Sequence, residues 1–503
     1  MAQEQLDSQG QTAEVETEEE FSREKFMQML EENFNPPDDD RKQGIADAVD
    51  VMVEQAMLGA PIIGDDVYGT VAAMRAEIDQ RLSEQMNAII HNEEFQALES
   101  AWRGLHHLVM NTPTGSDLKI KVLNVSKEEC RKTFKKFRDE AWDQSPLFNK
   151  IYEAEYGSFR GEPYAAFVCD YNFDHSGKDI EVMRGLSKIG AASHAPFISA
   201  AAPSLLQMED WTEIQNPRDL KALFDSPDYM AWRGFRESDD SRYMALTMPR
   251  FIGRDTYGEN GEPVDEFAFE EVTNGDHEKF LWCNSAYAFG VKIAQSFAHY
   301  GWCSQIRGVT SGGLVEDLPV PAFPTSSGGI DYKCPTEYSI PNRREAELSE
   351  CGLIPLIHGK NTDTAAFVGA QTVHKPAKYE GKGGKEATAN ANISARLPYI
   401  FASCRFAHYL KRMVYDWVGR SMTKDKLERE LHNWVLNYVA GNPETASDHV
   451  LASQPLSAAK VEVFEDEENP GYYKARFELA PHYQLEGVDA TLSMVSKIHD
   501  TKG

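Results

Sequence analysis

The sequence NEEFQALESAWRGLHHLV, residues 92–109, is the stretch around which we expect the rest of the chain to fold. Its apolar residues recur at steps of three and four positions and therefore share one side of a helix: Phe95, Leu98, Trp102, Leu105, Leu108 and Val109. Asn92 can accept hydrogen bonds from the free amides of the first turn, and TPTG at residues 112–115 ends the helix. The pattern predicts a helix whose apolar side packs in the core.

Length, composition and charge describe an acidic globular protein. With 503 residues, 41% of them hydrophobic, the chain is long enough for two or three domains with their own cores. We expect a cytoplasmic protein, because the sequence has neither an apolar run of about 18 residues nor a signal peptide. The formal net charge of −29 disfavours nucleic acid and membrane surfaces as partners. We therefore expect no nucleic acid binding and no membrane insertion.

Motifs for catalysis and metal binding are incomplete. The seven cysteines form no CxxC pair, which predicts reduced core residues rather than disulfides or a zinc site. Ser311 lies in GVTSGG, where Val309 replaces the first glycine of a nucleophile elbow, and Glu386 replaces the Ser or Thr of a phosphate loop. His106 and His107 are adjacent and point apart on a helix. We expect no catalytic residues, cofactor or metal.

Residues 1–60 are predicted to form an acidic, partly disordered N-terminal arm. The first 40 residues hold thirteen Asp or Glu against Arg23 and Lys25, and the first 20 have too little apolar surface to fold alone. Residues 21–30 have apolar edges on a short helix, which either docks on its own domain or is recognised by another protein. Helical spacing continues in residues 41–55 and 67–90.

Residues 61–377 are predicted to form the main α/β domain. Strand, helix and strand follow one another at residues 165–169, 180–192 and 195–199, which is typical of a parallel sheet. Further strands are expected at residues 118–125, 338–340, 353–357 and 365–373, and further helices at residues 127–138, 145–156, 217–223, 227–237, 280–300 and 343–350.

Residues 378–503 are predicted to form a C-terminal region. It begins with a polar stretch at residues 378–392, which we interpret as an exposed loop, followed by helices at residues 397–420 and 424–438. Residues 460–464 and 472–479 alternate as strands around EDEENPG, which predicts a hairpin. A lone hairpin is marginally stable, so it either completes a sheet with neighbouring chains or packs on its own domain.

Six blocks of the sequence resemble, in order, the large subunit of the type VI secretion contractile sheath, the TssC, VipB or EvpB family. The blocks are LESAWRGLHHLV, AASHAPFISAAAP, WRGFRESDDSRYMALTMPRFIGRDTYG, FAHYGWCSQIRGVTSGGLVEDLP, NRREAELSECGLIPL and ISARLPYIFASCRFAHYLK. The resemblance covers nearly the whole chain from about residue 60. It implies a structural protein with a mixed sheet core, flanking helices, a helical N-terminal arm and C-terminal strands that join a sheet between subunits, as in phage tail sheaths.

The resemblance also implies partners. These are the small sheath subunit (TssB or VipA), other sheath heterodimers, the inner tube protein Hcp, a baseplate and a ClpV-type AAA+ unfoldase. The residues expected in the inter-subunit strands are Val461, Val463, Phe464, Tyr473, Ala475, Phe477 and Leu479, and those expected in the unfoldase recognition helix are Phe26, Met29 and Leu30. The alternative is an unrecognised cytoplasmic α/β metabolic enzyme with its site near residues 308–313.

Overall fold

A computed structural model of the chain divides into two compact units. It describes residues 67–215, 219–258, 261–265, 267–325, 328–381, 383–417, 423–443, 445–465 and 473–482. One unit comprises Met1–Ile90 with Thr256–Val272, and the other comprises His91–Asp255 with Thr273–Gly503. The helices expected at residues 21–30 and 41–55 lie outside the described residues, and so do the predicted recognition residues Phe26, Met29 and Leu30.

The first unit contains helix α3 (Val67–Ile90), as predicted. The side chain of Asn87 connects α3 to the segment Thr256–Val272 through two hydrogen bonds. Its side-chain amide donates to the Glu270 carbonyl at 2.9 Å, and its side-chain oxygen accepts from the Val272 N–H at 2.8 Å. One side chain therefore supplies both backbone partners that a neighbouring strand would have offered.

A six-stranded mixed sheet forms the centre of the second unit. Its order is β1 (Phe167–Phe173), β2 (Phe197–Ala201), β3 (Met244–Met248), β9 (Leu353–His358), β10 (Ala365–Phe367) and β6 (Leu314–Val315). The first four strands are parallel, and β10 is antiparallel to both of its neighbours. The predicted parallel strand, helix, strand unit is confirmed, with α7 (Gly177–Ser193) between β1 and β2. Sequence analysis did not predict the central strand β3.

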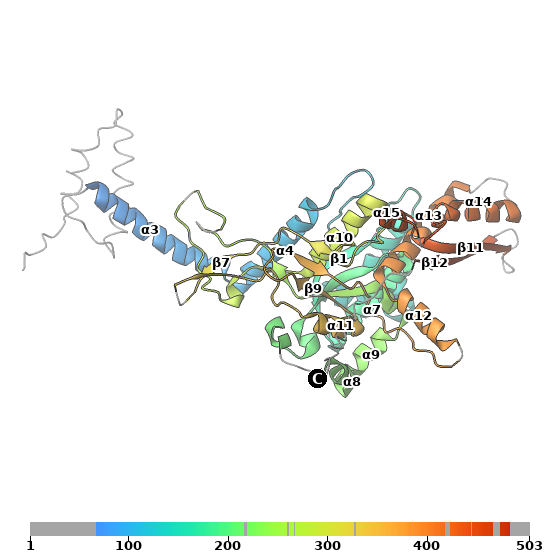
Figure 1. The fold of residues 1–503 in the computed structure, drawn as a ribbon, viewed down its shortest axis with the longest axis horizontal. Coiled ribbons are helices and arrows are strands. Elements are labelled where there is room, and N and C mark those ends of the chain that lie inside the picture. Colours follow the sequence, from blue (N-terminus) through green and yellow to red (C-terminus); the bar gives the residue numbers. More distant parts are fainter. Residues whose placement is uncertain are drawn as a thin grey trace, which may run out of the picture. The chain divides into compact units, whose positions relative to one another are not determined.

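Helices cover both faces of the sheet (Figure 1). Along β3, Met244 and Leu246 face a core shared with α7, whereas Ala245 faces a core shared with α10 (Ser285–Tyr300). This alternation follows from the two-residue period of a strand. Because both faces are covered, all five residues of β3 are buried, which is typical of a central parallel strand.

The remaining elements surround this sheet, and the two C-terminal strands form a separate two-stranded sheet. Before residue 397 they are α4 (Glu93–Met110), α5 (Lys127–Lys136), η1 (Asp139–Gln144), α6 (Pro146–Phe148), η2 (Asn149–Tyr156), η3 (Pro203–Leu206), η4 (Trp211–Gln215), α8 (Leu220–Asp225), η5 (Pro227–Tyr229), α9 (Met230–Arg236), η6 (Asp239–Tyr243), β4 (Phe251–Ile252), η7 (His277–Lys279), β5 (Trp282–Cys283), β7 (Ala322–Pro324), β8 (Ile330–Tyr332), α11 (Asn342–Glu350) and α12 (Gly384–Ser394). The C-terminal elements are α13 (Leu397–Trp417), α14 (Lys424–Leu436), α15 (Asp448–Ser453), β11 (Leu456–Glu465) and β12 (Tyr473–Pro481).

Helix α4 forms as predicted, but its predicted orientation is wrong. Asn92 caps it by accepting from the Glu94 and Phe95 amides. The face that packs on α10 contains Gly104, where a Cβ would lie 2.4 Å from the Tyr287 ring, so this position has no room for a side chain. Most of the apolar stripe faces solvent instead. Packing against α10 determines which face of α4 is buried. The apolar periodicity of α4 alone does not contain this information.

Three other expectations were wrong. Residues 118–125 form no strand, because no described strand pairs with them; instead Lys121 binds Glu155 at 2.8 Å and the Tyr171 hydroxyl binds the Val125 carbonyl. Residues 338–340 also form no strand. The expected loop at residues 378–392 contains helix α12, because its alanines favour helix.

Candidate functional site

The C-terminal hairpin is the candidate site that the sequence indicated, and its two strands pair as expected. β11 and β12 are antiparallel, with Val461 opposite Phe477 and Val463 opposite Ala475. Val461 and Val463 are buried in a cluster with side chains of α13 and α14. The cluster includes Phe406, Leu431 and Val435, with Phe477 and Leu479 packed at its margin. The apolar face of the hairpin is therefore covered by its own chain.

The outer edge of β12 has no strand partner among the described residues. The Val463 N–H donates to a carboxylate oxygen of Glu428 on α14 at 3.1 Å and therefore points away from β12. Residues directly opposite in an antiparallel pair either bond each other or both point outward. Ala475 therefore directs its N–H and C=O to the outer edge of β12, and every second residue of the strand does the same. This edge can accept another strand.

The predicted hairpin residues fall on different sides of the sheet. Phe464 lies on the face away from the helices and is 40% exposed, with the Arg476 guanidinium 6.0 Å from its ring centre. Tyr473 pairs with Glu465 at the end of the hairpin next to the connecting residues 466–472. Sequence analysis missed Glu428, and no local pattern could have found it, because its partner lies 35 residues away.

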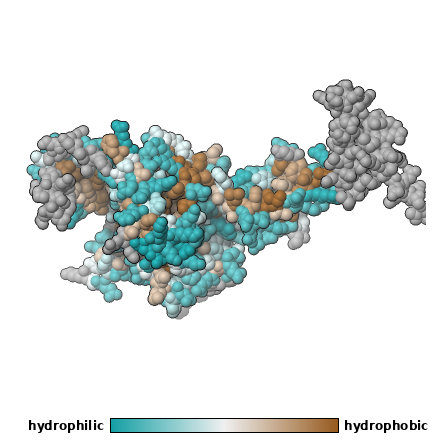
Figure 2. Space-filling model, turned by 180° about the vertical axis from the view of Figure 1, so that it is seen from behind, coloured by the Kyte–Doolittle hydropathy of each residue, from teal (hydrophilic) through white to brown (hydrophobic). Residues whose placement is uncertain are grey.

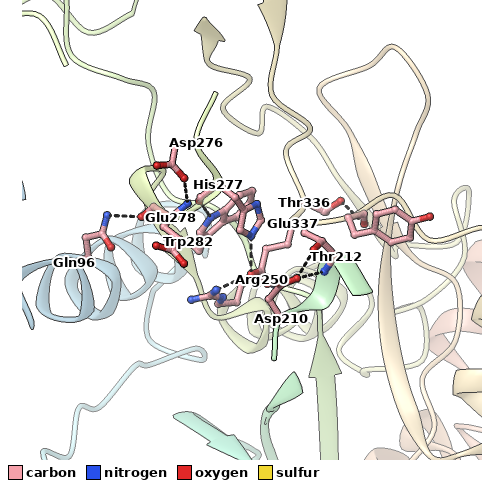
Figure 3. A network of polar contacts seen from close by, with 11 residues as sticks. Gln96, Asp210, Thr212, Arg250, Asp276, His277, Glu278, Trp282, Thr336 and Glu337 are labelled. Atoms are coloured by element: carbon pink, nitrogen blue, oxygen red, sulfur yellow. Dashed lines mark hydrogen bonds and ion pairs between the residues drawn. The ribbon is translucent and has the colours of Figure 1, made fainter. Parts of the chain in front are cut away.

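A second group of polar residues surrounds the buried carboxylate of Glu337 (Figure 3). Arg250 donates to both of its oxygens, from the side chain at 2.6 Å and from the backbone N–H at 2.9 Å, and His277 Nε2 lies at 3.5 Å. Burial raises the pKa of Glu337, but His277 and Arg250 outweigh it and hold the pKa below its ordinary value. The carboxylate is therefore ionised, and both of its oxygens already accept hydrogen bonds. This suits a structural ion pair rather than a catalytic acid.

The loop proposed for the alternative enzyme is a tight structural turn. The Gly308 N–H donates to the Phe367 carbonyl of β10 at 2.7 Å, and the Gly313 N–H closes the loop on the Gly308 carbonyl at 2.9 Å. A Cβ on Gly313 would lie 2.4 Å from the Phe367 oxygen, so the glycine is needed for close approach. Ser311 is exposed, and no described residue forms a hydrogen bond that could activate it.

A surface cleft of about 610 Å³ also lacks catalytic groups. Its described lining contains no Ser, Cys or His: Ile214, Gln215, Asp219, Leu220, Lys221, Tyr338, Pro341, Arg343, Arg344 and Glu347. Four of its charged residues are engaged in ion pairs: Lys221 with Glu350 at 2.6 Å, and both Arg344 and Arg343 with Glu347, at 2.6 Å and 3.5 Å.

The described residues contain no group of three His, Cys, Asp or Glu side chains placed to hold a metal ion. Burial, with the nearby Lys292 and His106, lowers the pKa of His107 to about 4, so this residue is a neutral packing group beside Phe251. All seven cysteines are free thiols, four of them buried. None of the helices in the described ranges is long and apolar enough to cross a membrane.

Comparisons with known proteins decide which kind of protein carries these surfaces. Residues 72–374 match the VipB family, described as EvpB/VC_A0108, tail sheath N-terminal domain. Residues 386–498 match VipB_2, described as EvpB/VC_A0108, tail sheath gpW/gp25-like domain. The type VI secretion system sheath protein TssC1 of Pseudomonas aeruginosa PAO1 is 52% identical over 496 residues, 98% of each chain. The chain belongs to this sheath family.

As a member of the VipB family, the chain is a structural subunit of a contractile sheath and not an enzyme. The predicted family, α/β class and structural role are confirmed, and the alternative of a metabolic enzyme is not favoured.

Solved structures are more distant. The anti-feeding prophage baseplate has a TM-score of 0.34 and 12% identity over 62% of this chain and 64% of that chain. The contracted anti-feeding prophage sheath has a TM-score of 0.29 and 14% identity over 62% and 67%. Scores this low carry no argument, and the assignment depends on the sequence matches.

Proposed function

We propose that this chain is the large subunit of a type VI sheath and pairs in the cytoplasm with the small sheath subunit, TssB or VipA. Heterodimers stack on a baseplate into a tube around the inner tube protein Hcp, and contraction drives the inner tube out. A heterologous contact repeated by a screw operation does not close, so it builds a filament.

The observation that carries this proposal is the outer edge of β12, which no described strand covers. The apolar face of the hairpin is already covered by α13 and α14, so the hairpin offers neighbours its edge and not its face. A strand from the adjacent heterodimer would satisfy the outward N–H and C=O groups. Such backbone bonds can persist while flanking linkers bend, which a contracting tube requires.

Two finer assignments belong to the same proposal. Phe26, Met29 and Leu30 form the element that a ClpV-type unfoldase recognises after contraction; the apolar edge within an acidic segment supports this assignment. A division into an arm (1–60), a main domain (61–377) and a C-terminal domain (378–503) is supported by the two family matches, which end at residue 374 and begin again at residue 386.

Co-expression tests the proposal. The full chain, produced together with the small sheath subunit from the neighbouring gene, is expected to form long tubules in negative-stain micrographs and to pellet on ultracentrifugation. The small subunit alone is the control. A chain that stays a dispersed monomer in the presence of its partner would contradict the assignment.

A further inference from the structure

The two edges of the C-terminal hairpin differ in the hydrogen bonds that the chain itself makes to them. Figure 2 shows bands of exposed hydrophobic surface on one face of the molecule, but such bands do not by themselves identify a partner. A strand edge is more informative, because hydrogen bonds show which of its backbone groups are already paired. The outer edge of β12 has no strand partner among the described residues, whereas the outer edge of β11 is occupied at two points.

The N-terminal end of the β11 edge is paired with the chain's own backbone. The Leu456 N–H donates to the Tyr438 carbonyl at 3.1 Å, and the Leu456 carbonyl accepts from the Ala440 N–H at 2.9 Å. Val439 and Leu456 therefore form a parallel bridge. Because residues 438–440 follow α14 closely, the connection that leaves this helix covers the end of the edge. An additional strand cannot pair with Leu456.

A side chain occupies the other end of the β11 edge. Glu428 on α14 accepts a hydrogen bond from the Val463 N–H at 3.1 Å through a carboxylate oxygen. A carboxylate accepts hydrogen bonds but donates none, so it cannot continue the ladder as a backbone would. It also repels the carbonyl oxygens of an approaching strand. Charged side chains at the edges of natural sheets prevent unwanted strand pairing in this way.

The remaining part of the β11 edge is too short for a strand. Residues with the orientation of Val463 recur at every second position, and between Val463 and the bulge after Leu456 these are Ala459 and Val461. Strands in globular proteins usually have at least three residues. The β12 edge, by contrast, has one continuous row of outward residues: Tyr473, Ala475, Phe477 and Leu479. A strand can therefore join β12 but not β11.

We propose that Glu428 determines which edge of the hairpin a neighbouring strand joins, by keeping the outer edge of β11 closed. The inference rests on the proposed function, in which strand addition connects adjacent heterodimers. With one edge open, each hairpin accepts a neighbour in one place only, and the connection keeps one direction along the tube. With both edges open, a hairpin can also pair with a wrong neighbour, which favours irregular aggregates.

Residue-resolved hydrogen exchange of the wild-type heterodimer, before and after assembly, tests the choice of edge. Phe477 and Val461 are directly opposite each other and direct their N–H groups to opposite edges, so they form a matched pair. Assembly should slow exchange of the Phe477 amide at least about 10-fold and leave the Val461 amide unchanged. Slower exchange of the Val461 amide in wild-type tubules would overturn the proposal.

Variants of α14 test the role of Glu428 itself. Glu428→Ala should keep the heterodimer but replace regular tubules by irregular aggregates, in which exchange of the Val461 amide is slowed. Glu428→Gln keeps an acceptor for the Val463 N–H and should assemble like the wild type. Glu430→Ala is the matched control, because it removes an exposed carboxylate from the same helix, and it should also assemble normally.

The two possible failures are distinguishable. Assemblies of Glu428→Ala that leave exchange of the Val461 amide unchanged, whatever their form in micrographs, would overturn the role of Glu428, because a merely structural contact does not redirect a strand. Absence of tubules from the wild-type chain and its partner would refute the proposed function instead.

Discussion

Single buried histidines make the fold sensitive to acid. His408 on α13 lies 3.0 Å from the Ser193 carbonyl at the end of α7, and its Nε2–H donates that hydrogen bond. Burial, together with Arg405, His194 and Lys411, lowers its pKa from 6.5 to about 4, although the hydrogen bond to Ser193 opposes the shift. Between these values the unfolded chain binds a proton here and the folded chain does not. The contribution of neutral His408 to stability is therefore lost as pH falls from about 6.5 towards 4.

The direction of this pKa shift gives a prediction for His408. The melting temperature of the wild type should fall between pH 7 and pH 5, and His408→Gln should reduce the fall, because glutamine keeps an amide donor and takes up no proton. Equal pH slopes for the wild type and His408→Gln would contradict the assignment of the shift to His408.

At the scale of elements, the role of the β12 edge in assembly can be tested separately from the stability of the hairpin. Ala475 directs its N–H outward, whereas the neighbouring Arg476, which is opposite Glu462, directs its N–H into the ladder. Proline removes the donor at either position. Ala475→Pro should therefore keep the heterodimer and its melting temperature but abolish long tubules in micrographs.

Arg476→Pro is the matched control for this edge. It removes a bond within the hairpin, so it should lower the melting temperature of the heterodimer itself by the equivalent of about 1–3 kcal/mol. If the hairpin served only its own domain, Ala475→Pro would assemble normally. Tubules of wild-type length from the Ala475→Pro variant would therefore contradict the proposed role of the β12 edge in assembly.

The sequence predicted those elements whose signals are local. The cap of α4 at Asn92, the paired strands β11 and β12, and the largely apolar helix α13 were all found, because capping, alternation and apolarity on several sides are visible within each segment. The buried side of α4 was not found, because it depends on Tyr287, which is distant in the chain. Residues 118–125 have the alternation of a strand, but a ladder also needs a partner backbone, and the described chain supplies none.

The same distinction applies to the candidate site. The hairpin residues could be named from their alternation, whereas the outward direction of Ala475 required the long-range bond between Glu428 and Val463. The stripe of α4 was visible in the sequence but was interpreted as core. Apolar periodicity reports that a face will be covered, and it does not report which chain covers it.

At the scale of the whole molecule, charge is concentrated where the sequence has the least apolar surface. The first 40 residues hold thirteen acidic side chains, and the apolar positions Phe26 and Leu30 stand among them. A short amphipathic segment of this kind gains stability mainly by binding a groove on a partner. Under the proposed function, the unfoldase acts only on contracted sheath, so we expect access to this segment to depend on the state of the tube.

The corresponding test therefore uses assembled tubes. Phe26→Asp with Leu30→Asp should leave tubule length unchanged and abolish co-sedimentation of a ClpV-type unfoldase with contracted tubes, because the apolar edge that fills the groove is replaced by charge. Gln28→Asp adds a charge to the same segment without removing an apolar side chain, so it should bind like the wild type. Wild-type tubes held in the extended state should bind less unfoldase than contracted ones. Retained binding by the double variant would place the recognition element elsewhere in the sheath, since the acidic segment would then lack the contact that distinguishes the two states.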